Sequence, residues 1–114
     1  MSKKLLSFVI PAYCEQENLR PLSQTIQSVM EKRLPDYGWE IIFVDDGSPD
    51  QSGQVLDELS AQDENCKAVE LSRNFGKEIA LSAGVDYASG EAVICLDADL
   101  QHPPERIPEM VREW

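Results

Sequence analysis

Residues 93–105 read VICLDADLQHPPE, an apolar run that continues into two aspartates and a glutamine and is closed by two prolines. The apolar half, rich in Val and Ile, favours a strand that is buried on both faces. Asp97, Asp99 and Gln101 occupy every second position, so on an extended chain their side chains point the same way. The stretch predicts a buried strand whose end carries a row of oxygen ligands.

Three similar apolar runs precede this one along the chain, at residues 5–10, 41–44 and 68–71. Apolar residues at helical spacing separate the runs, at residues 19–30, 55–59 and 77–88. Gly90 is the expected stop of the third helix, and a last helix is expected to begin at Pro103 or Pro104 and to run into Trp114. This alternation predicts a parallel α/β sheet with right-handed crossovers.

The composition favours one folded domain. The length of 114 residues fits a single domain, and 42% of the residues are hydrophobic. The net charge of −11 argues against a general affinity for nucleic acid, which depends on clustered Lys and Arg. No apolar stretch approaches the roughly 18 residues of a membrane-spanning helix, and Pro11 interrupts the first run too early for a signal peptide. We therefore expect a soluble, cytoplasmic chain.

The cysteines agree with that compartment. Cys14, Cys66 and Cys95 are odd in number, widely spaced and never in a CxxC pair. This pattern predicts reduced, mostly buried thiols rather than disulfides. A structural role is favoured over a nucleophilic one for Cys14, because free cysteines usually behave as small hydrophobes.

Polar residues gather directly after each predicted strand. They are Pro11, Ala12, Tyr13 and Glu15 after the first strand, and Asp45–Ser48, Arg73–Lys77 and Asp97–Gln101 after the others. In open α/β sheets, ligands bind beyond the carboxyl ends of the strands. The sequence therefore predicts that four loops share one ligand-binding rim.

The acidic row after the fourth strand is the strongest chemical signal. Two neighbouring carboxylates repel, and a divalent cation removes that cost. Ligands that are all oxygen suit Mg²⁺ or Mn²⁺, which keep positions open for phosphates, so we expect a nucleotide diphosphate to bind through such an ion. An EF-hand is excluded because His102 and Pro108 stand where its glycine and glutamate belong. The alternative is a solvated acidic turn.

The other loops leave alternatives open. Asp45 is a candidate contact to a base or ribose, whereas Ser48 or Asp50 could cap the following helix. Tyr13 could lie beside a base or only fill space. The cations at this rim, Arg73 and Lys77, could meet phosphate or neutralise the acids.

Four ordered stretches carry a resemblance that covers nearly the whole chain: FVIPAYCEQENL (8–19), IIFVDDGSPDQS (41–52), LSRNFGKEIALSAGVDYASGE (71–91) and VICLDADLQHPPE (93–105). Together they resemble the N-terminal part of family 2 glycosyltransferases, within these the polyprenyl-phosphate sugar transferases such as dolichyl-phosphate mannose synthases and bactoprenol glucosyltransferases. The resemblance implies a truncated GT-A type fold, which is a mostly parallel, Rossmann-like α/β sheet with flanking helices. It also implies inverting transfer with Mg²⁺ or Mn²⁺.

The resemblance implies roles for individual residues as well. Contact with the nucleotide-sugar is implied for Pro11, Ala12, Tyr13, Glu15, Asp45, Lys77, Asp97, Ala98 and Asp99. Within this set, Asp45 would hold the base or ribose, and Lys77 would flank the nucleotide or the acceptor. Ligation of the metal beside the pyrophosphate is implied for Asp97, Asp99 and Gln101.

In that family the general base lies after the nucleotide-binding half, and residues 1–114 hold no candidate for it. We therefore expect residues 1–114 to be the N-terminal, nucleotide-sugar-binding part of a hexosyltransferase and to be inactive alone. The whole enzyme would act at the cytoplasmic membrane, with a UDP- or GDP-sugar as donor and a polyprenyl phosphate as acceptor. The alternatives are a non-catalytic nucleotide-binding module and a phosphoacceptor signalling domain. The sugar, the nucleotide and the oligomeric state are left open.

Overall fold

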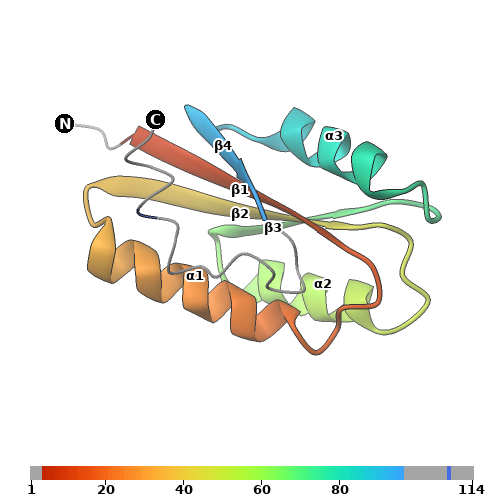
Figure 1. Cartoon of the computed structure of the whole chain (residues 1–114). Coiled ribbons are helices and arrows are strands. Elements are labelled where there is room, and N and C mark those ends of the chain that lie inside the picture. Colours follow the sequence, from red (N-terminus) through yellow and green to blue (C-terminus); the bar gives the residue numbers. More distant parts are fainter. Residues whose placement is uncertain (1–3, 97–107, 109–114) are drawn as a thin grey trace.

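A computed structural model describes residues 4–96 and Pro108 (Figure 1). The described strands are β1 (Lys4–Ala12), β2 (Tyr37–Asp45), β3 (Cys66–Glu70) and β4 (Ala92–Cys95). The described helices are α1 (Leu19–Arg33), α2 (Ser52–Gln62) and α3 (Lys77–Tyr87). Strand and helix alternate from β1 to β4, as the sequence predicts.

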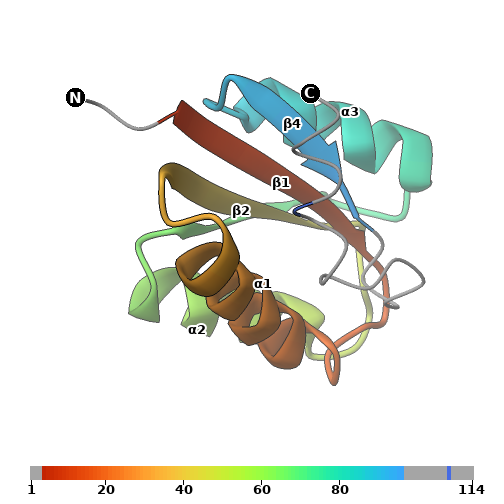
Figure 2. The same cartoon turned by 60° about the vertical axis from the view of Figure 1, so that its left-hand side comes forward.

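The strands form one parallel sheet in the order β3-β2-β1-β4. Phe8 at the middle of β1 pairs with Ile41 of β2 on one side and with Ile94 of β4 on the other. Figures 1 and 2 show α1 and α2 on one face of the sheet and α3 on the opposite face. The prediction of a parallel α/β sheet is confirmed.

The larger part of the core lies between the sheet and the helices α1 and α2. Alternate residues of the central strands point to this face, among them Phe8 and Phe43, which are fully buried. Leu22 and Ile26, at helical spacing on α1, pack against them. On the other face, Gly84 brings α3 so close that an added Cβ would lie 2.4 Å from Cγ1 of Val9.

Several expectations about burial are wrong. The strands β3 and β4 have exposed or half-buried residues on both faces, because they are the outer strands of the described sheet. Of the three thiols, only that of Cys66 is buried, whereas Cys14 and Cys95 are exposed. Cys14 lies in a loop with φ of 57°, where strand periodicity does not apply.

The ends of the helices also differ from expectation. The helix α3 ends at Tyr87, and Gly90 is not its stop but a residue of the loop that precedes β4. Of the predicted last helix, only Pro108 is described, and it is helical and buried. None of the helices in the described part of the chain is long and apolar enough to cross a membrane.

Candidate functional site

The carboxyl ends of β1, β2 and β3 form one level edge, which we call the rim. In the last row of the sheet, Ala12 pairs with Asp45, and Asp45 pairs with Glu70. The edge is closed by two further bonds, in which the Asp46 amide donates to the Ala12 carbonyl at 2.9 Å and the Leu71 amide donates to the Asp45 carbonyl at 2.9 Å. The predicted meeting of loops at this edge is confirmed for the three described loops.

The fourth strand ends beside the same edge. Leu96, the residue after β4, donates its amide to the Val9 carbonyl at 3.0 Å, so the chain still follows β1 at this point. Val9 lies three residues before Ala12 at the rim. At Leu96 the chain therefore still runs alongside β1 toward the rim.

Asp46 ties the loop after β3 to the end of β2. Its carboxylate is buried and accepts hydrogen bonds from the Phe75 amide at 2.9 Å and from the Gly76 amide at 3.1 Å. The two loops also touch at Gly47, which has φ of 70°, and a Cβ added there would lie 2.2 Å from the carbonyl carbon of Arg73. Asp46 and Gly47 therefore fix the position of the Arg73–Gly76 loop.

The loop after β1 is joined to the loop after β2. The Cys14 amide donates to Oγ of Ser48 at 3.0 Å, and the Glu15 amide donates to Oγ of Ser52 at 3.2 Å. A third bond runs from the Gln51 amide to Oε1 of Gln16 at 2.8 Å. A hollow of about 410 Å³ lies at this junction, lined by Cys14, Glu15, Gln16, Glu17, Asn18 and Asp50.

The candidate nucleotide contacts Pro11, Ala12 and Asp45 are the last residues of β1 and β2, not loop residues as expected, and they lie at this rim together with Tyr13 and Glu15. Ala12 and Asp45 are register partners and are buried, whereas Tyr13 is 46% exposed. Pro11 is half-buried, and the carboxylate of Glu15 accepts from Nδ2 of Asn18 at 2.6 Å. The rim thus has an exposed aromatic ring beside fixed carboxylates.

Asp45 is held from two sides. Its Oδ1 accepts the Ser48 amide at 3.0 Å, and its Oδ2 lies 3.0 Å from the position that a Cβ on Gly53 would take. Gly53 belongs to the first turn of α2, and helix N-termini favour negative charge. Asp45 therefore has a fixed orientation at the rim.

Ser48 and Asp50, the two candidates for capping α2, have different roles in the structure. Ser48 does not cap α2, because its hydroxyl accepts the Cys14 amide instead. Asp50 bonds the amide of Ser52, the first residue of α2, at 3.0 Å, although the N-cap position belongs to Gln51. Ser48 serves the junction between loops, and Asp50 serves the helix start.

The two cations of the rim have different surroundings. Arg73 places its guanidinium 4.7 Å from the ring centroid of Phe75. Lys77 is the first residue of α3, and its charge acts on Cys95 at the end of β4. Burial raises the pKa of Cys95, and the positive charge of Lys77 lowers it in part. Lys77 therefore lies toward the strand that leads into Asp97.

Two acids of this region were missed by the sequence analysis. The pKa of Glu70 is raised, first because it shares a hydrogen bond with Asp57, then by burial and by the negative charges of Asp57 and Asp45. Glu70 could have been found, because it ends the third strand just as Asp45 ends the second. Asp57 gave no such signal, because only the packing of α2 brings it to this edge.

The predicted metal ligands Asp97, Asp99 and Gln101, and the predicted nucleotide contact Ala98, lie outside the described residues. Within residues 4–96 and Pro108, no group of three or more His, Cys, Asp or Glu side chains is placed to hold a metal ion. Asp46 is unsuited to that task, because both of its oxygens accept backbone amides. The described part of the rim therefore consists of joined loops without a complete metal site.

Known proteins with similar sequences are glycosyltransferases. An uncharacterized glycosyltransferase of Synechocystis sp. is 51% identical over 109 residues, which are 96% of this chain and 34% of that protein. The undecaprenyl-phosphate 4-deoxy-4-formamido-L-arabinose transferase of Pseudomonas fluorescens is 46% identical, over 95% of this chain and 31% of its own length. The bactoprenol glucosyl transferase of Shigella phage SfV is 40% identical, over 96% and 35%. The chain spans about a third of the length of these relatives.

Solved structures share the fold. Staphylococcus aureus TarS 1-349 in complex with UDP-GlcNAc superposes with a TM-score of 0.68 at 25% identity, over 86% of this chain and 27% of that one. The mannosyltransferase PcManGT of Pyrobaculum calidifontis, in complex with GDP-Man and Mn²⁺, superposes with a TM-score of 0.71 at 22% identity, over 93% and 30%. The GT-A type fold is thereby confirmed. Since the family model "Glycosyl transferase family 2" matches residues 7–114, the chain belongs to glycosyl transferase family 2.

Proposed function

We propose that residues 1–114 are the donor-binding part of an inverting glycosyltransferase that uses a nucleotide diphospho-sugar. The observation that carries this proposal is the bonding of the loops after β1, β2 and β3 into one rim, beside which β4 ends. Pre-formed loops reduce the ordering cost of ligand binding. A nucleotide, with its flat base, is the kind of ligand that such a rim can hold.

The residues of the rim suit the parts of a nucleotide. Tyr13 offers an exposed ring on which a base can stack, and Asp45 offers an oriented carboxylate that can accept hydrogen bonds from a base or ribose. Pro11, Ala12 and Glu15 complete the side of the site built by β1. Lys77, toward the end of β4, is the cation that would meet the phosphates or the acceptor.

Asp97, Asp99 and Gln101 are the residues that would hold Mg²⁺ or Mn²⁺, and Ala98 would lie along the nucleotide. A divalent ion would supply charge stabilisation for the leaving diphosphate. The rim itself favours this choice, because Asp45, Asp57 and Glu70 make it negative and a diphosphate is negative too. A cation between them removes that repulsion.

The acceptor of the whole protein is proposed to be a polyprenyl phosphate, on the cytoplasmic side of a membrane. Two relatives support this class of acceptor, because their names specify undecaprenyl phosphate and bactoprenol. The general base is proposed to lie outside residues 1–114, since the carboxylates Asp45 and Asp46 of the described rim are already hydrogen-bonded. Residues 1–114 alone would then bind donor without transferring it.

Calorimetric titration of the chain with UDP and with GDP, each with and without Mn²⁺, tests the proposal. We expect one nucleotide to bind in the presence of Mn²⁺, and Asp99→Ala to weaken that binding by at least about tenfold through loss of a metal ligand. Asp36→Ala is the matched control, because Asp36 is an exposed aspartate in the turn before β2, at the opposite end of the sheet. Absence of binding by a chain with a folded circular dichroism spectrum would contradict the proposal.

A further inference from the structure

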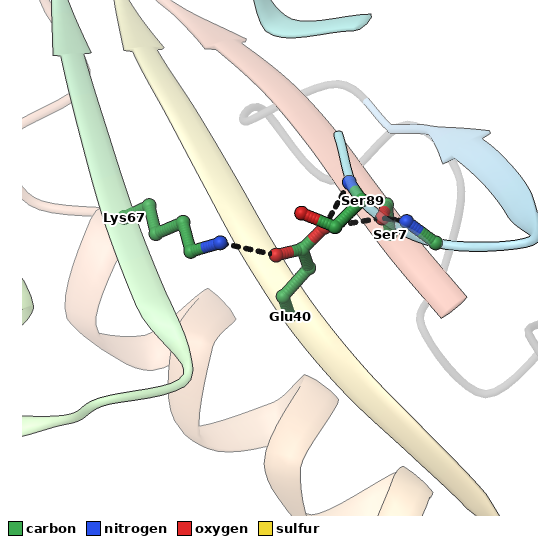
Figure 3. A network of polar contacts seen from close by, with 5 residues as sticks. Ser7, Glu40, Lys67 and Ser89 are labelled. Atoms are coloured by element: carbon green, nitrogen blue, oxygen red, sulfur yellow. Dashed lines mark hydrogen bonds and ion pairs between the residues drawn. The ribbon is translucent and has the colours of Figure 1, made fainter. Parts of the chain in front are cut away.

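A buried carboxylate lies at the end of the sheet opposite to the rim. Glu40 of β2 is only 5% exposed. It accepts hydrogen bonds from Nζ of Lys67 at 2.7 Å, from Oγ of Ser7 at 2.5 Å and from the Ser89 amide at 2.7 Å (Figure 3). One carboxylate thus joins β1, β2, β3 and the loop that precedes β4.

The loop before β4 is hydrogen-bonded to β1 and β2 and packs closely on β1. The Gly90 amide donates to Oγ of Ser7 at 2.8 Å, and the same hydroxyl donates a hydrogen bond to Glu40. A Cβ added to Gly90 would lie 2.5 Å from Oγ of Ser7 and 2.8 Å from the Leu5 carbonyl oxygen. Ser7 therefore links Glu40 indirectly to a second backbone amide, that of Gly90, and the loop packs directly on β1.

The strand β4 needs such a constraint more than its neighbours do. It has four residues and, within the described sheet, pairs with β1 alone. A slip of one residue would move the end of a strand by about 3.3 Å and would exchange the faces of every following side chain. Asp97 and Asp99 follow this strand, so an error of register at its start would be carried into the acidic run.

Stability alone is a weak reason for a buried carboxylate paired with a half-exposed lysine. Burial of a charge is costly, and apolar replacements of buried ion pairs are often neutral or stabilising. A buried carboxylate with directed donors does select one arrangement among several. The donors to Glu40 include a side chain of β3 and a backbone amide next to β4, so the selection concerns how the strands are aligned.

We propose that Glu40 fixes the register of β4 and is thereby a positioning residue for donor binding at the far end of that strand. Among the described residues, its hydrogen-bond donors are Lys67, Ser7 and Ser89, at the end of the sheet opposite to the rim. The effect on donor binding rests on the function proposed above, whereas the effect on β4 does not.

Amide hydrogen exchange, measured on the natural full-length protein, tests whether Glu40 fixes β4. Glu40→Leu removes the acceptor of the Ser89 amide, and we expect the amides of residues 89–96 to exchange at least about tenfold faster, while those of β2 and β3 change less than about threefold. Lys67→Met removes the ion pair but keeps the bonds to Ser7 and Ser89, so β4 should remain within about threefold of the native rate.

Three further variants distinguish a role of Glu40 in fixing β4 from a general loss of stability. Glu40→Gln can keep an oxygen toward Ser89 and Ser7 and turn its amide toward the half-exposed Lys67, so it should restore slow exchange in β4. Ser7→Ala breaks the link to Gly90 and replaces Glu40→Leu if the latter does not fold. Ser23→Ala removes a buried hydroxyl that contacts Sγ of Cys66 and should leave β4 unchanged.

Titration of the same variants with UDP and GDP in the presence of Mn²⁺ tests the effect on donor binding. We expect the dissociation constant to rise about tenfold in Glu40→Leu and to stay near the native value in Lys67→Met and Ser23→Ala. Equal acceleration of exchange in all strands, or an unchanged dissociation constant with a loosened β4, would overturn the proposal. If the native protein binds neither nucleotide, the function proposed above fails, and the exchange pattern still decides whether Glu40 fixes β4.

Discussion

Two glutamates on the same sheet show how its two ends differ. Glu40, near the start of β2, has a lowered pKa, because hydrogen bonds from Lys67, Ser7 and Ser89 together outweigh the opposing effect of burial. Glu70, at the end of β3, has a raised pKa, because it faces Asp57 and Asp45. Identical side chains are thus fully paired at one end and crowded by like charges at the other.

The difference teaches where this molecule can accept a cationic partner. At the Glu40 end, the donors present satisfy the carboxylate, and nothing is gained by a further ligand. At the rim, Asp45 and Asp46 accept backbone amides, and Glu70 faces the like charges of Asp57 and Asp45. A metal-bound nucleotide would gain more at the rim than at any paired carboxylate.

The largest effect is expected from Gly47→Ala, which breaks the rim. Its added Cβ would lie 2.2 Å from the backbone of Arg73, at a φ of 70°. Backbone strain and displacement of the Arg73–Gly76 loop should together cost about 3 kcal/mol of unfolding free energy in urea.

Gly76→Ala is the matched control for that loss. Gly76 also has a positive φ, of 103°, but among the described residues beyond its chain neighbours no atom lies within 4 Å of the added Cβ. It should lose only the backbone part, about 1 kcal/mol. Equal losses for the two variants would show that the contact between the loops contributes nothing.

The sequence predicted the sheet and the existence of the rim because both follow from local patterns. Buried parallel strands are continuous apolar runs, and loop residues at their carboxyl ends must meet at one edge. The outer strands β3 and β4 were expected to be more buried than they are, because strand order does not appear in the hydrophobic pattern.

Side-chain partners could not be predicted in the same way. Glu40 stands just before the apolar run at residues 41–44, like any polar flanking residue, and its donors come from positions 7, 67 and 89. Likewise, the contact between Asp57 and Glu70 depends on how α2 packs on β3. Such pairings are set by tertiary structure, so only the site residues at strand ends could be predicted from the sequence.

A smaller, pH-dependent effect on the free energy of unfolding is expected at the Glu40 end of the sheet. The pKa of Glu40 is lower in the folded state than in the unfolded state, so its stabilisation is complete above the ordinary glutamate pKa and is lost as the pH falls through the folded pKa. Glu40→Gln should therefore cost about 1 kcal/mol at pH 7, and the difference from the native chain should shrink as the pH falls below the ordinary glutamate pKa. Urea unfolding between pH 7 and pH 3 measures this, and a constant difference would contradict it.

The smallest effect on the free energy of unfolding is expected from Glu70 at the rim, and it has the opposite sign. The pKa of Glu70 is raised on folding, so its ionisation destabilises the fold, and this penalty appears as the pH rises from the unfolded pKa through the folded one. Glu70→Gln should therefore stabilise the chain at neutral pH, but by only a few tenths of a kcal/mol, because solvent screens an exposed side chain.

Any loss of negative charge will relieve some repulsion in a chain with a net charge of −11. The control for Glu70→Gln is therefore Glu64→Gln, which removes the same charge from an exposed glutamate just before β3. Urea unfolding at pH 7 and at pH 4 should show a larger gain for Glu70→Gln at pH 7 and no difference between the variants at pH 4. Equal gains in stability at pH 7 would show that Asp57 and Asp45 do not repel Glu70, so Glu70 would not contribute to the crowding of negative charge at the rim. The excess gain of Glu70→Gln over Glu64→Gln thus measures how much like charge the rim holds before any ligand binds.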